Sequence, residues 1–250
     1  MTAEEWRTRC DLAAAYRLIA DYGWDDIVFT HLSARVPGRD EHFLLNPYGF
    51  AFDEITAESL VKVDLDGVPV ERTEYGVNPA GFTIHSAVHG ARDDAGAVMH
   101  LHTDAGVAVS AMSRGLMPLS QHSGFVCPDL AYHEWEGVAL DLDERSRLVR
   151  DLGDRHFMLL WNHGTLAVGD SVASCFLRLY YFEKSCRFQV NALAADEPHL
   201  PSDSAIAAME QFNTVESWEG LARVAWPALL RRAERLGLKM PIHSETHEKR

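Results

Sequence analysis

The sequence predicts an α/β fold in which helices cover one mixed, largely antiparallel β-sheet. Segments with the 3.6-residue spacing of amphipathic helices alternate along the chain with short runs that have the two-residue spacing of strands. Tight turns join some of these runs and helices join others, and such connections give antiparallel and parallel neighbours respectively. The chain has 250 residues, of which 47% are hydrophobic and 24% charged, as expected for a globular protein with a large core.

The first half of the chain contains two predicted helices and several strands. Residues 4–23 repeat apolar side chains at helical spacing, and Gly23 is expected to end this helix. Strand-like runs occupy residues 26–36, 42–47 and 61–71. The last run contains Asp66-Gly67, a pair typical of hairpin turns. A helix over residues 80–92 then leads into a buried strand over residues 94–102.

The second half repeats this alternation. Asp104 is expected to cap the N-terminus of a helix over residues 104–112. The remaining predicted elements are a helix at 142–153, two strands within 155–169, a long helix at 171–195 and a final helix at 216–237. We therefore expect one domain over residues 1–200 and a C-terminal helical extension over residues 201–250, which ends in a polar tail.

Charge and cysteine content restrict the partners and the location. The formal net charge of −14 disfavours nucleic acids and anionic membranes, because both are polyanions. No run reaches the roughly 18 apolar residues of a membrane span, and the N-terminus lacks a signal-peptide pattern. The four cysteines show no CxxC spacing, so reduced thiols are expected. We expect a cytoplasmic protein that binds a small molecule.

Two histidines one residue apart, His100 and His102, end the apolar run "GAVMHLH". Side chains alternate along a strand, so both imidazoles point to one face, about 6.6 Å apart along the strand. The alternative is a chance pair, because the chain contains 13 histidines. His163 is a third candidate ligand, since it follows the apolar run "FMLLW" and precedes Gly164, which permits a sharp turn.

Three histidines that leave coordination positions open favour a catalytic divalent metal over a structural one. The expected ion is zinc. Manganese, cobalt and iron are alternatives, because imidazole binds all of them.

The segments "AVMHLHTDAGVAVSAM" and "LLWNHGTLAVG" resemble the paired metal motifs of the class II aldolase/adducin family. "WDDIVFTHLSARVPG", "FLLNPYG" and "NPAGFTIHSAVHGARDDAGAV" resemble its adducin-like branch, and the resemblance covers most of residues 5–195. It implies a three-layer αβα domain and a homotetramer. It also implies a metal on His100, His102 and His163 that polarises a substrate carbonyl and stabilises an enolate.

Two departures from the sugar-phosphate aldolases of this family affect the chemistry. Their acid/base glutamate lies four residues before a helix histidine, and the matching position before His85 is Gly81. Loss of a general acid or base costs about 10²- to 10⁴-fold in rate. Their phosphate-binding GNxS loop reads Thr30-His31-Leu32-Ser33 here, so a substrate without a phosphate group is expected. The predicted substrate-binding residues are Thr30, His31, Ser33, Tyr48, Gly49 and Gly81.

His122 is the candidate replacement for the missing acid, because the resemblance places it after a strand where the aldolases have a tyrosine proton donor. The alternative is a surface histidine or one behind the site. His85 is expected to pack or hydrogen-bond within its own helix. Asp104, besides capping its helix, could orient a ligand imidazole.

Three functions remain open. The first is a metal-dependent lyase, aldolase-like or a decarboxylase, that acts on a non-phosphorylated carbonyl or carboxylate substrate; decarboxylation needs no prior proton removal. The second is a non-haem iron oxygenase that uses the same three histidines. The third is a non-catalytic interaction module like the adducin head, which the presence of all three histidines disfavours. In an oligomer, Trp218 and Trp226 of the final helix are expected at the interface, unless they simply cover the sheet.

Overall fold

The structure is a computed structural model that describes residues 1–137 and 143–238. Its centre is a seven-stranded sheet with the strand order β3-β2-β1-β4-β7-β6-β5. β5 and β6 run parallel, and the other neighbouring pairs in this sheet run antiparallel. The strands are β1 (His31–Val36), β2 (Arg39–Leu45), β3 (Val61–Asp64), β4 (Ala97–Leu101), β5 (Leu130–His133), β6 (Phe157–Leu160) and β7 (Gly164–Gly169). The predicted mixed, largely antiparallel sheet is confirmed.

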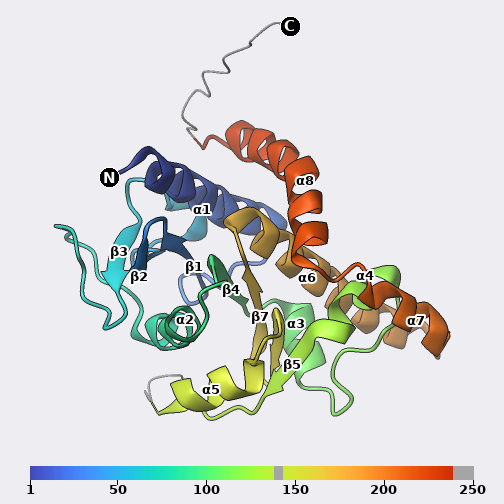
Figure 1. The fold of residues 1–250 in the computed structure, drawn as a ribbon. Helices are drawn as coiled ribbons and strands as arrows, with labels where there is room; N and C mark the ends of the chain where they lie inside the picture. Colours follow the sequence, from blue (N-terminus) through green and yellow to red (C-terminus); the bar gives the residue numbers. More distant parts are fainter. Residues whose placement is uncertain (138–142, 239–250) are drawn as a thin grey trace, which may run out of the picture.

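Helices cover both faces of this sheet, so the architecture has three layers, as predicted (Figure 1). One layer contains α1 (Ala3–Tyr22), α6 (Val172–Ala195) and α8 (Val215–Arg235), and the other contains α2 (Pro79–Ala91) and α5 (Glu144–Leu152). The shorter helices are α3 (Asp104–Ser110), α4 (Gln121–Val126), α7 (Asp203–Glu210), η1 (Phe52–Glu54) and η2 (Cys127–Asp129). No helix among the described residues is both long and apolar enough to cross a membrane.

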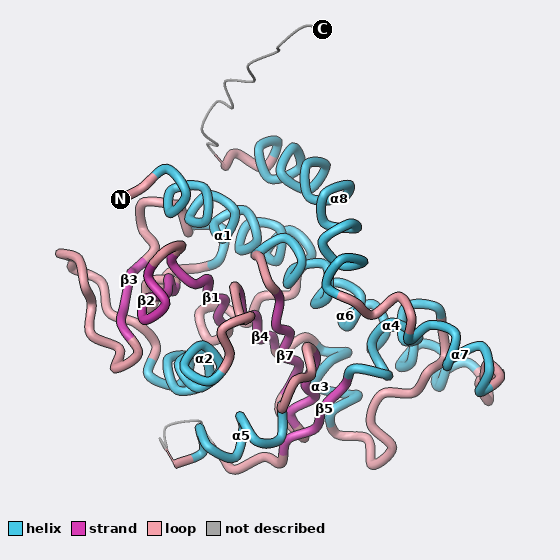
Figure 2. Tube along the Cα trace, in the orientation of Figure 1, coloured by secondary structure: helices cyan, strands magenta, loops and turns pink. Residues whose placement is uncertain are grey.

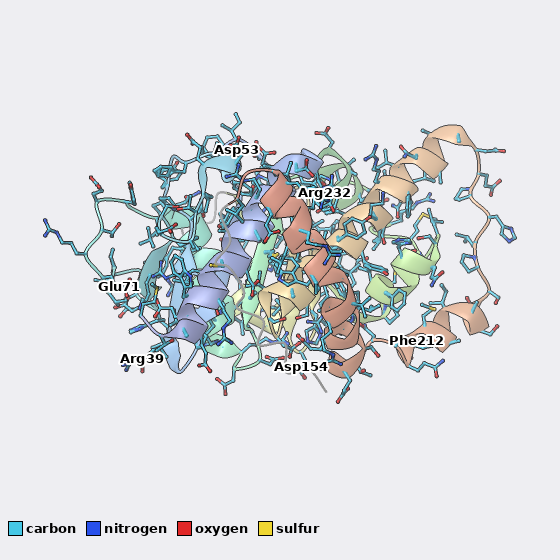
Figure 3. All side chains as sticks on the ribbon, turned by 90° about the horizontal axis from the view of Figure 1, so that it is seen from above. Arg39, Asp53, Glu71, Asp154, Phe212 and Arg232 are labelled. Atoms are coloured by element: carbon cyan, nitrogen blue, oxygen red, sulfur yellow. The ribbon has the colours of Figure 1, made fainter. Side chains whose placement is uncertain are left out.

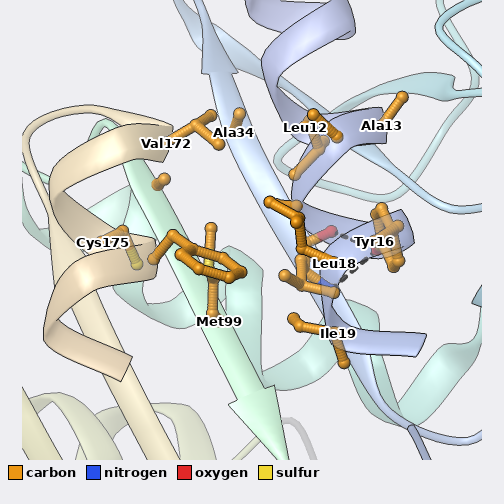
Figure 4. Close-up of a cluster of buried hydrophobic side chains, with 14 of the residues drawn as sticks. Leu12, Ala13, Tyr16, Leu18, Ile19, Ala34, Met99, Val172 and Cys175 are labelled. Atoms are coloured by element: carbon orange, nitrogen blue, oxygen red, sulfur yellow. Dashed lines mark hydrogen bonds between the residues drawn. The ribbon is translucent and has the colours of Figure 1, made fainter. Parts of the chain in front are cut away.

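Helix α1 starts and stops where its sequence predicts. The Thr2 side chain accepts a hydrogen bond from the backbone N–H of Glu5, and Gly23 ends the helix with a left-handed φ of 64°. Its apolar side, which includes Leu18, packs against the central strands, where Met99 and Ala34 lie (Figure 4). This packing holds β1 and β4 firmly side by side.

The predicted hairpin over residues 61–71 forms only in part. Gly67 makes the expected turn with φ 81°, but the returning segment contributes a single bridge, between Pro69 and Val63. Proline has no backbone N–H, so it cannot continue a ladder of hydrogen bonds. The chain then continues as a loop as far as α2 (Figure 2).

Of the two alternatives for Trp218 and Trp226, the structure supports packing within the chain and not exposure at an interface. Their exposed fractions are 1% and 7%, because α8 packs them onto α1 and α6. Figure 3 shows α8 beside α1, where Arg232 forms an ion pair with Asp21 at 2.5 Å. The two tryptophans therefore complete the core. The predicted polar tail at 243–250 lies outside the described residues, and all four cysteines are free thiols.

Candidate metal centre

The structure brings His100, His102 and His163 together at one end of the central strands. One nitrogen from each imidazole lies within 4.8 Å of the other two. The ring centroids are 4.7 to 4.8 Å apart. His100 lies near the end of β4 and His102 just beyond it, while His163 lies in the turn between β6 and β7. Because β7 pairs with β4, this turn lies beside the end of β4.

The short segment Asn162-His163-Gly164 places the third imidazole. Asn162 adopts a left-handed φ of 55°, which asparagine tolerates better than most residues. At Gly164 an added Cβ would lie 2.3 Å from the carbonyl oxygen of Leu101, so a larger residue would push β7 away from β4. The glycine therefore permits the close approach that brings His163 to its partners.

Hydrogen bonds aim the lone pairs of this cluster at a common point. Nδ1 of His100 donates to the carbonyl of Thr165 at 2.9 Å, and Nδ1 of His102 lies 2.9 Å from the Asp26 carboxylate. In neutral imidazoles this leaves both Nε2 atoms as lone pairs, and they lie 2.9 Å apart. Lone pairs at this distance repel unless a cation lies between them, so the donor set fits a divalent metal.

Burial keeps His100 and His163 neutral. Desolvation lowers the pKa of His163 to about 4, with the neighbouring His102 as a further cause. It lowers the pKa of His100 well below the ordinary range, and the charges of His163 and His102 act in the same direction. At neutral pH both imidazoles are available to bind a metal without first losing a proton.

A buried carboxylate lies behind the cluster. Glu183 of α6 accepts hydrogen bonds from the hydroxyls of Thr103 and Thr165. Thr103 follows His102 in the sequence, and the backbone carbonyl of Thr165 accepts the hydrogen bond from His100. Desolvation raises the pKa of Glu183 to about 7. Thr103 also accepts from the backbone of Gly106 and is the N-cap of α3. The prediction that Asp104 is this N-cap is therefore wrong by one residue, and Asp104 lies in the first turn.

His31 occupies the space of the missing glutamate. It stands directly opposite His100 on the neighbouring antiparallel strand, and the two ring centroids are 5.1 Å apart. An added Cβ on Gly81 would lie 2.5 Å from Cδ2 of His31 and 3.0 Å from its Nε2. A side chain on residue 81 and the His31 ring therefore cannot both fit.

The sequence led us to expect that His85 packs or hydrogen-bonds within its own helix. Its side chain instead forms hydrogen bonds with residues of β1. Its Nε2 lies 2.8 Å from Nδ1 of His31, and its Nδ1 makes a short hydrogen bond with the Ser33 hydroxyl. The same hydroxyl lies 2.7 Å from Nε2 of His89. Sequence reasoning missed His89, although Gly81, His85 and His89 have the four-residue spacing of one helix face. Asp26 and Glu183 were also missed, and neither lies in a recognisable motif.

Other predicted site residues lie in different environments. Thr30 is fully buried, and its hydroxyl has no hydrogen-bond partner among the described residues. Tyr48 and Gly49 lie in the loop after β2, where the Tyr48 side chain is 48% exposed. Among the described contacts, Thr30, Tyr48 and Gly49 make no hydrogen bond or ring contact with His100, His102 or His163.

His122 lies on the short helix α4. Residues 121–126 form a helix, which a capping box at Ser120 begins, and the segment directly before it, residues 111–120, contains no strand. The His122 ring stacks on Tyr181 with centroids 4.9 Å apart. Burial lowers its pKa, and Lys184 contributes to the same shift. Within the described part of one chain, the structure does not bring His122 to the clustered histidines.

Comparisons with known proteins agree with this arrangement. Residues 10–190 match the family described as Class II Aldolase and Adducin N-terminal domain. A Caulobacter vibrioides protein provisionally named an aldolase class 2 protein is 53% identical over 232 residues, which cover 92% of this chain and 90% of that protein. Mouse alpha-adducin is 44% identical over 190 residues, which cover 75% of this chain and 26% of adducin.

The crystal structure of an aldolase II superfamily protein from Pseudomonas syringae superposes with a TM-score of 0.90 and 48% identity, covering 95% of this chain and 96% of that chain. The family match spans all seven strands of the sheet and includes all three clustered histidines. This chain therefore belongs to the class II aldolase and adducin family.

Proposed function

We propose that this protein is a metal-dependent lyase that cleaves a carbon–carbon bond in a non-phosphorylated carbonyl or carboxylate substrate. The observation that carries the proposal is the convergence of three imidazole nitrogens within 4.8 Å, two of which, the Nε2 atoms of His100 and His102, lie 2.9 Å apart. Lewis-acid polarisation of a substrate oxygen is the chemistry that such a site supplies with a divalent metal bound. Zinc is the first candidate, and manganese, cobalt and iron share the preference for imidazole.

The surroundings of the site support a substrate without a phosphate group. The Ser33 hydroxyl, which falls in the segment that matches the aldolase phosphate loop, is already hydrogen-bonded to His85 and His89. It therefore offers no free donor to a phosphate oxygen. His31, the residue beside the cluster, is a neutral imidazole and not a cation that would attract a dianion, since burial lowers its pKa well below the ordinary range.

The position of Gly81 supports decarboxylation over a retro-aldol reaction. A retro-aldol reaction needs a base to remove a hydroxyl proton, and no carboxylate can project from residue 81. Loss of carbon dioxide needs no such proton removal. The chain's own residues then have two tasks: His100, His102 and His163 would hold the metal, and Asp26 and the Thr165 carbonyl orient two of these ligands.

Metal analysis tests the proposal. Protein purified without oxygen and reconstituted with zinc is expected to hold about one ion per chain by mass spectrometry, since three ligands converge on one point. His100→Ala and His163→Ala are expected to lose it, whereas His199→Ala, which removes an exposed histidine, is not. Absence of metal from the reconstituted wild type would overturn the proposal. If the protein as purified holds iron, oxygen consumption with 2-oxo and hydroxy acids is measured before the lyase screen.

A second candidate function is a non-catalytic interaction module. The 44% identity with mouse alpha-adducin over 190 residues supports it. The two functions are distinguished by turnover: a protein that binds zinc but releases neither carbon dioxide from a panel of 3-oxo acids nor an aldehyde from a panel of 3-hydroxy carbonyl compounds would favour the interaction module. A homotetramer, a cytoplasmic location and a domain boundary near residue 200 remain predictions, and light scattering after size-exclusion chromatography tests the first of them.

A further inference from the structure

Four buried polar side chains beside the metal centre form one continuous chain of hydrogen bonds. It runs from His31 through His85 and Ser33 to His89, and it ends on the backbone carbonyl of Ala95. Each of the four side-chain residues is at most 3% exposed. Bulk water therefore cannot offer these groups alternative partners, and their donors and acceptors must pair with one another.

The carbonyl of Ala95 sets the direction of every hydrogen bond in this chain. A carbonyl only accepts, so Nδ1 of His89, 3.1 Å away, carries the hydrogen and its Nε2 is an acceptor. The Ser33 hydroxyl then donates to Nε2 of His89 and accepts from Nδ1 of His85. Nε2 of His85 is consequently an acceptor, and Nδ1 of His31 donates to it.

A neutral imidazole has a single N–H, so Nε2 of His31 is left as a lone pair. Burial favours the neutral form throughout, because each of the three rings is at most 3% exposed and their hydrogen-bond partners among the described residues include no carboxylate that would stabilise an imidazolium. The tautomer of His31 is thus determined by a backbone carbonyl at the far end of the chain.

The imidazole ring that carries this lone pair lies beside His100 of the candidate metal centre, with ring centroids 5.1 Å apart. Nδ1 of His31 points to His85 on α2, so Nε2 points away from that helix side chain. Among the described residues Nε2 has no hydrogen-bond partner, and it lies 3.0 Å from the place where a Cβ on Gly81 would be. His31 is not a member of the three-histidine group itself, although its ring faces His100.

We propose that Nε2 of His31 accepts a hydrogen bond from a hydroxyl group of the substrate, and that His85, Ser33 and His89 are positioning residues that hold His31 in this tautomer. The substrate contact rests on the proposed function, whereas the tautomer does not depend on a metal. This row of hydrogen bonds accordingly selects a substrate that carries an O–H beside its carbonyl or carboxylate group.

The first experiment determines the tautomers in metal-free protein labelled with ¹⁵N-histidine, from two-bond proton–nitrogen correlations. His31, His85 and His89, assigned by single His→Gln variants, are each expected to show a protonated Nδ1 and a pyridine-type Nε2. A protonated Nε2 on His31 in the wild type would overturn the proposal, whether or not any variant folds. Ser33→Ala is expected to give a mixture of His31 tautomers. Ser86→Ala, which removes a buried hydroxyl of α2 outside the chain, is expected to match the wild type.

The second experiment compares two probes on zinc-loaded protein by calorimetry. Glycolate and methoxyacetate differ in one hydrogen-bond donor, so the wild type and Ser86→Ala are expected to bind glycolate about tenfold more tightly, the effect of one buried hydrogen bond. In Ser33→Ala the preference is expected to fall to about twofold or less while zinc content stays unchanged. An equal preference in Ser33→Ala and wild type would overturn the role of the chain. If the protein binds no zinc, the proposed function fails, and the tautomer measurement still decides the positioning role.

Discussion

The Asp26 carboxylate lies 2.9 Å from Nδ1 of His102, although 76 residues separate them in sequence. The carboxylate fixes the orientation of this imidazole and increases its basicity as a metal ligand. Asp26→Ala is therefore expected to weaken zinc binding about 10- to 100-fold without unfolding the protein. Competition with a chromophoric chelator measures the change. Asp25→Ala removes the adjacent exposed carboxylate and is the control; equal affinities in the two variants would contradict the orienting role.

The contact between Gly81 and His31 predicts a rescue. Gly81→Ala forces a Cβ against the buried imidazole and is expected to lower the free energy of unfolding by about 1 to 3 kcal/mol. In a His31→Ala background, Gly81→Ala is expected to leave the free energy of unfolding unchanged. Urea denaturation of all four proteins measures this coupling.

Gly90→Ala is the control for that cycle, because it lies on the same helix and its nearest atom, on Leu65, is 4.0 Å away. This variant is expected to be neutral or slightly stabilising, since alanine favours helix over glycine by about 1 kcal/mol. If Gly81→Ala behaves like Gly90→Ala, the two residues do not compete for space.

Glu183 predicts a pH dependence of stability. Its pKa is raised from 4.5 to about 7 in the folded protein, so the folded state binds more protons than the unfolded state between these values. The stability contributed by this group is complete below the unfolded pKa and is lost as pH rises through the folded pKa. In metal-free protein, the free energy of unfolding of the wild type minus that of Glu183→Gln is expected to fall by about 3 kcal/mol between about pH 4 and pH 8.

The difference from Glu183→Gln is the quantity to measure because the buried histidines act in the opposite direction. Their lowered pKa values make the folded state less stable as pH falls below the ordinary histidine pKa. Glu210→Gln, on the surface of α7, serves as the control and is expected to leave the pH profile unchanged. A flat difference for Glu183→Gln would mean that this carboxyl is not protonated in the folded protein near neutral pH.

Ile27 is strained, and the strain lies next to Asp26. It has φ 53°, a left-handed conformation that β-branched residues avoid, while its side chain is 68% exposed. Ile27→Asn is expected to raise the free energy of unfolding by about 1 kcal/mol, because asparagine tolerates this conformation and little packing is lost. Val68→Asn changes a similarly exposed β-branched residue of ordinary φ and is expected to leave the free energy of unfolding unchanged. Thermal and urea denaturation of the two variants measure the difference.

The features that the sequence predicts well are those determined by a few residues that are neighbours in the sequence. Gly23 ends α1, and the two-residue spacing of His100 and His102 predicts their shared face. The segment Asn162-His163-Gly164 predicts a tight turn between two strands. Each of these depends on local backbone geometry, which a short stretch of sequence determines.

The features that escaped prediction depend on pairings between distant residues. β5 is four residues long and forms only because β6 offers it a parallel neighbour. The partner of His85 is His31, 54 residues away, and Glu183 meets Thr103 across 80 residues. No local pattern records such contacts, since they arise when α2 and α6 pack onto opposite faces of the sheet.

Because the side chains of positions 31 and 81 fill one volume, they form a single exchangeable unit. The resemblance to the sugar-phosphate aldolases matches these two positions with an asparagine and a glutamate, which implies that in those enzymes the group at this point comes from the helix. Here histidine and glycine stand there, and it comes from the strand. In this chain the pair places an imidazole at this point, and a carboxylate side chain on residue 81 would require a smaller residue at position 31. A relative with bulky residues at both positions must have rebuilt the junction between β1 and α2.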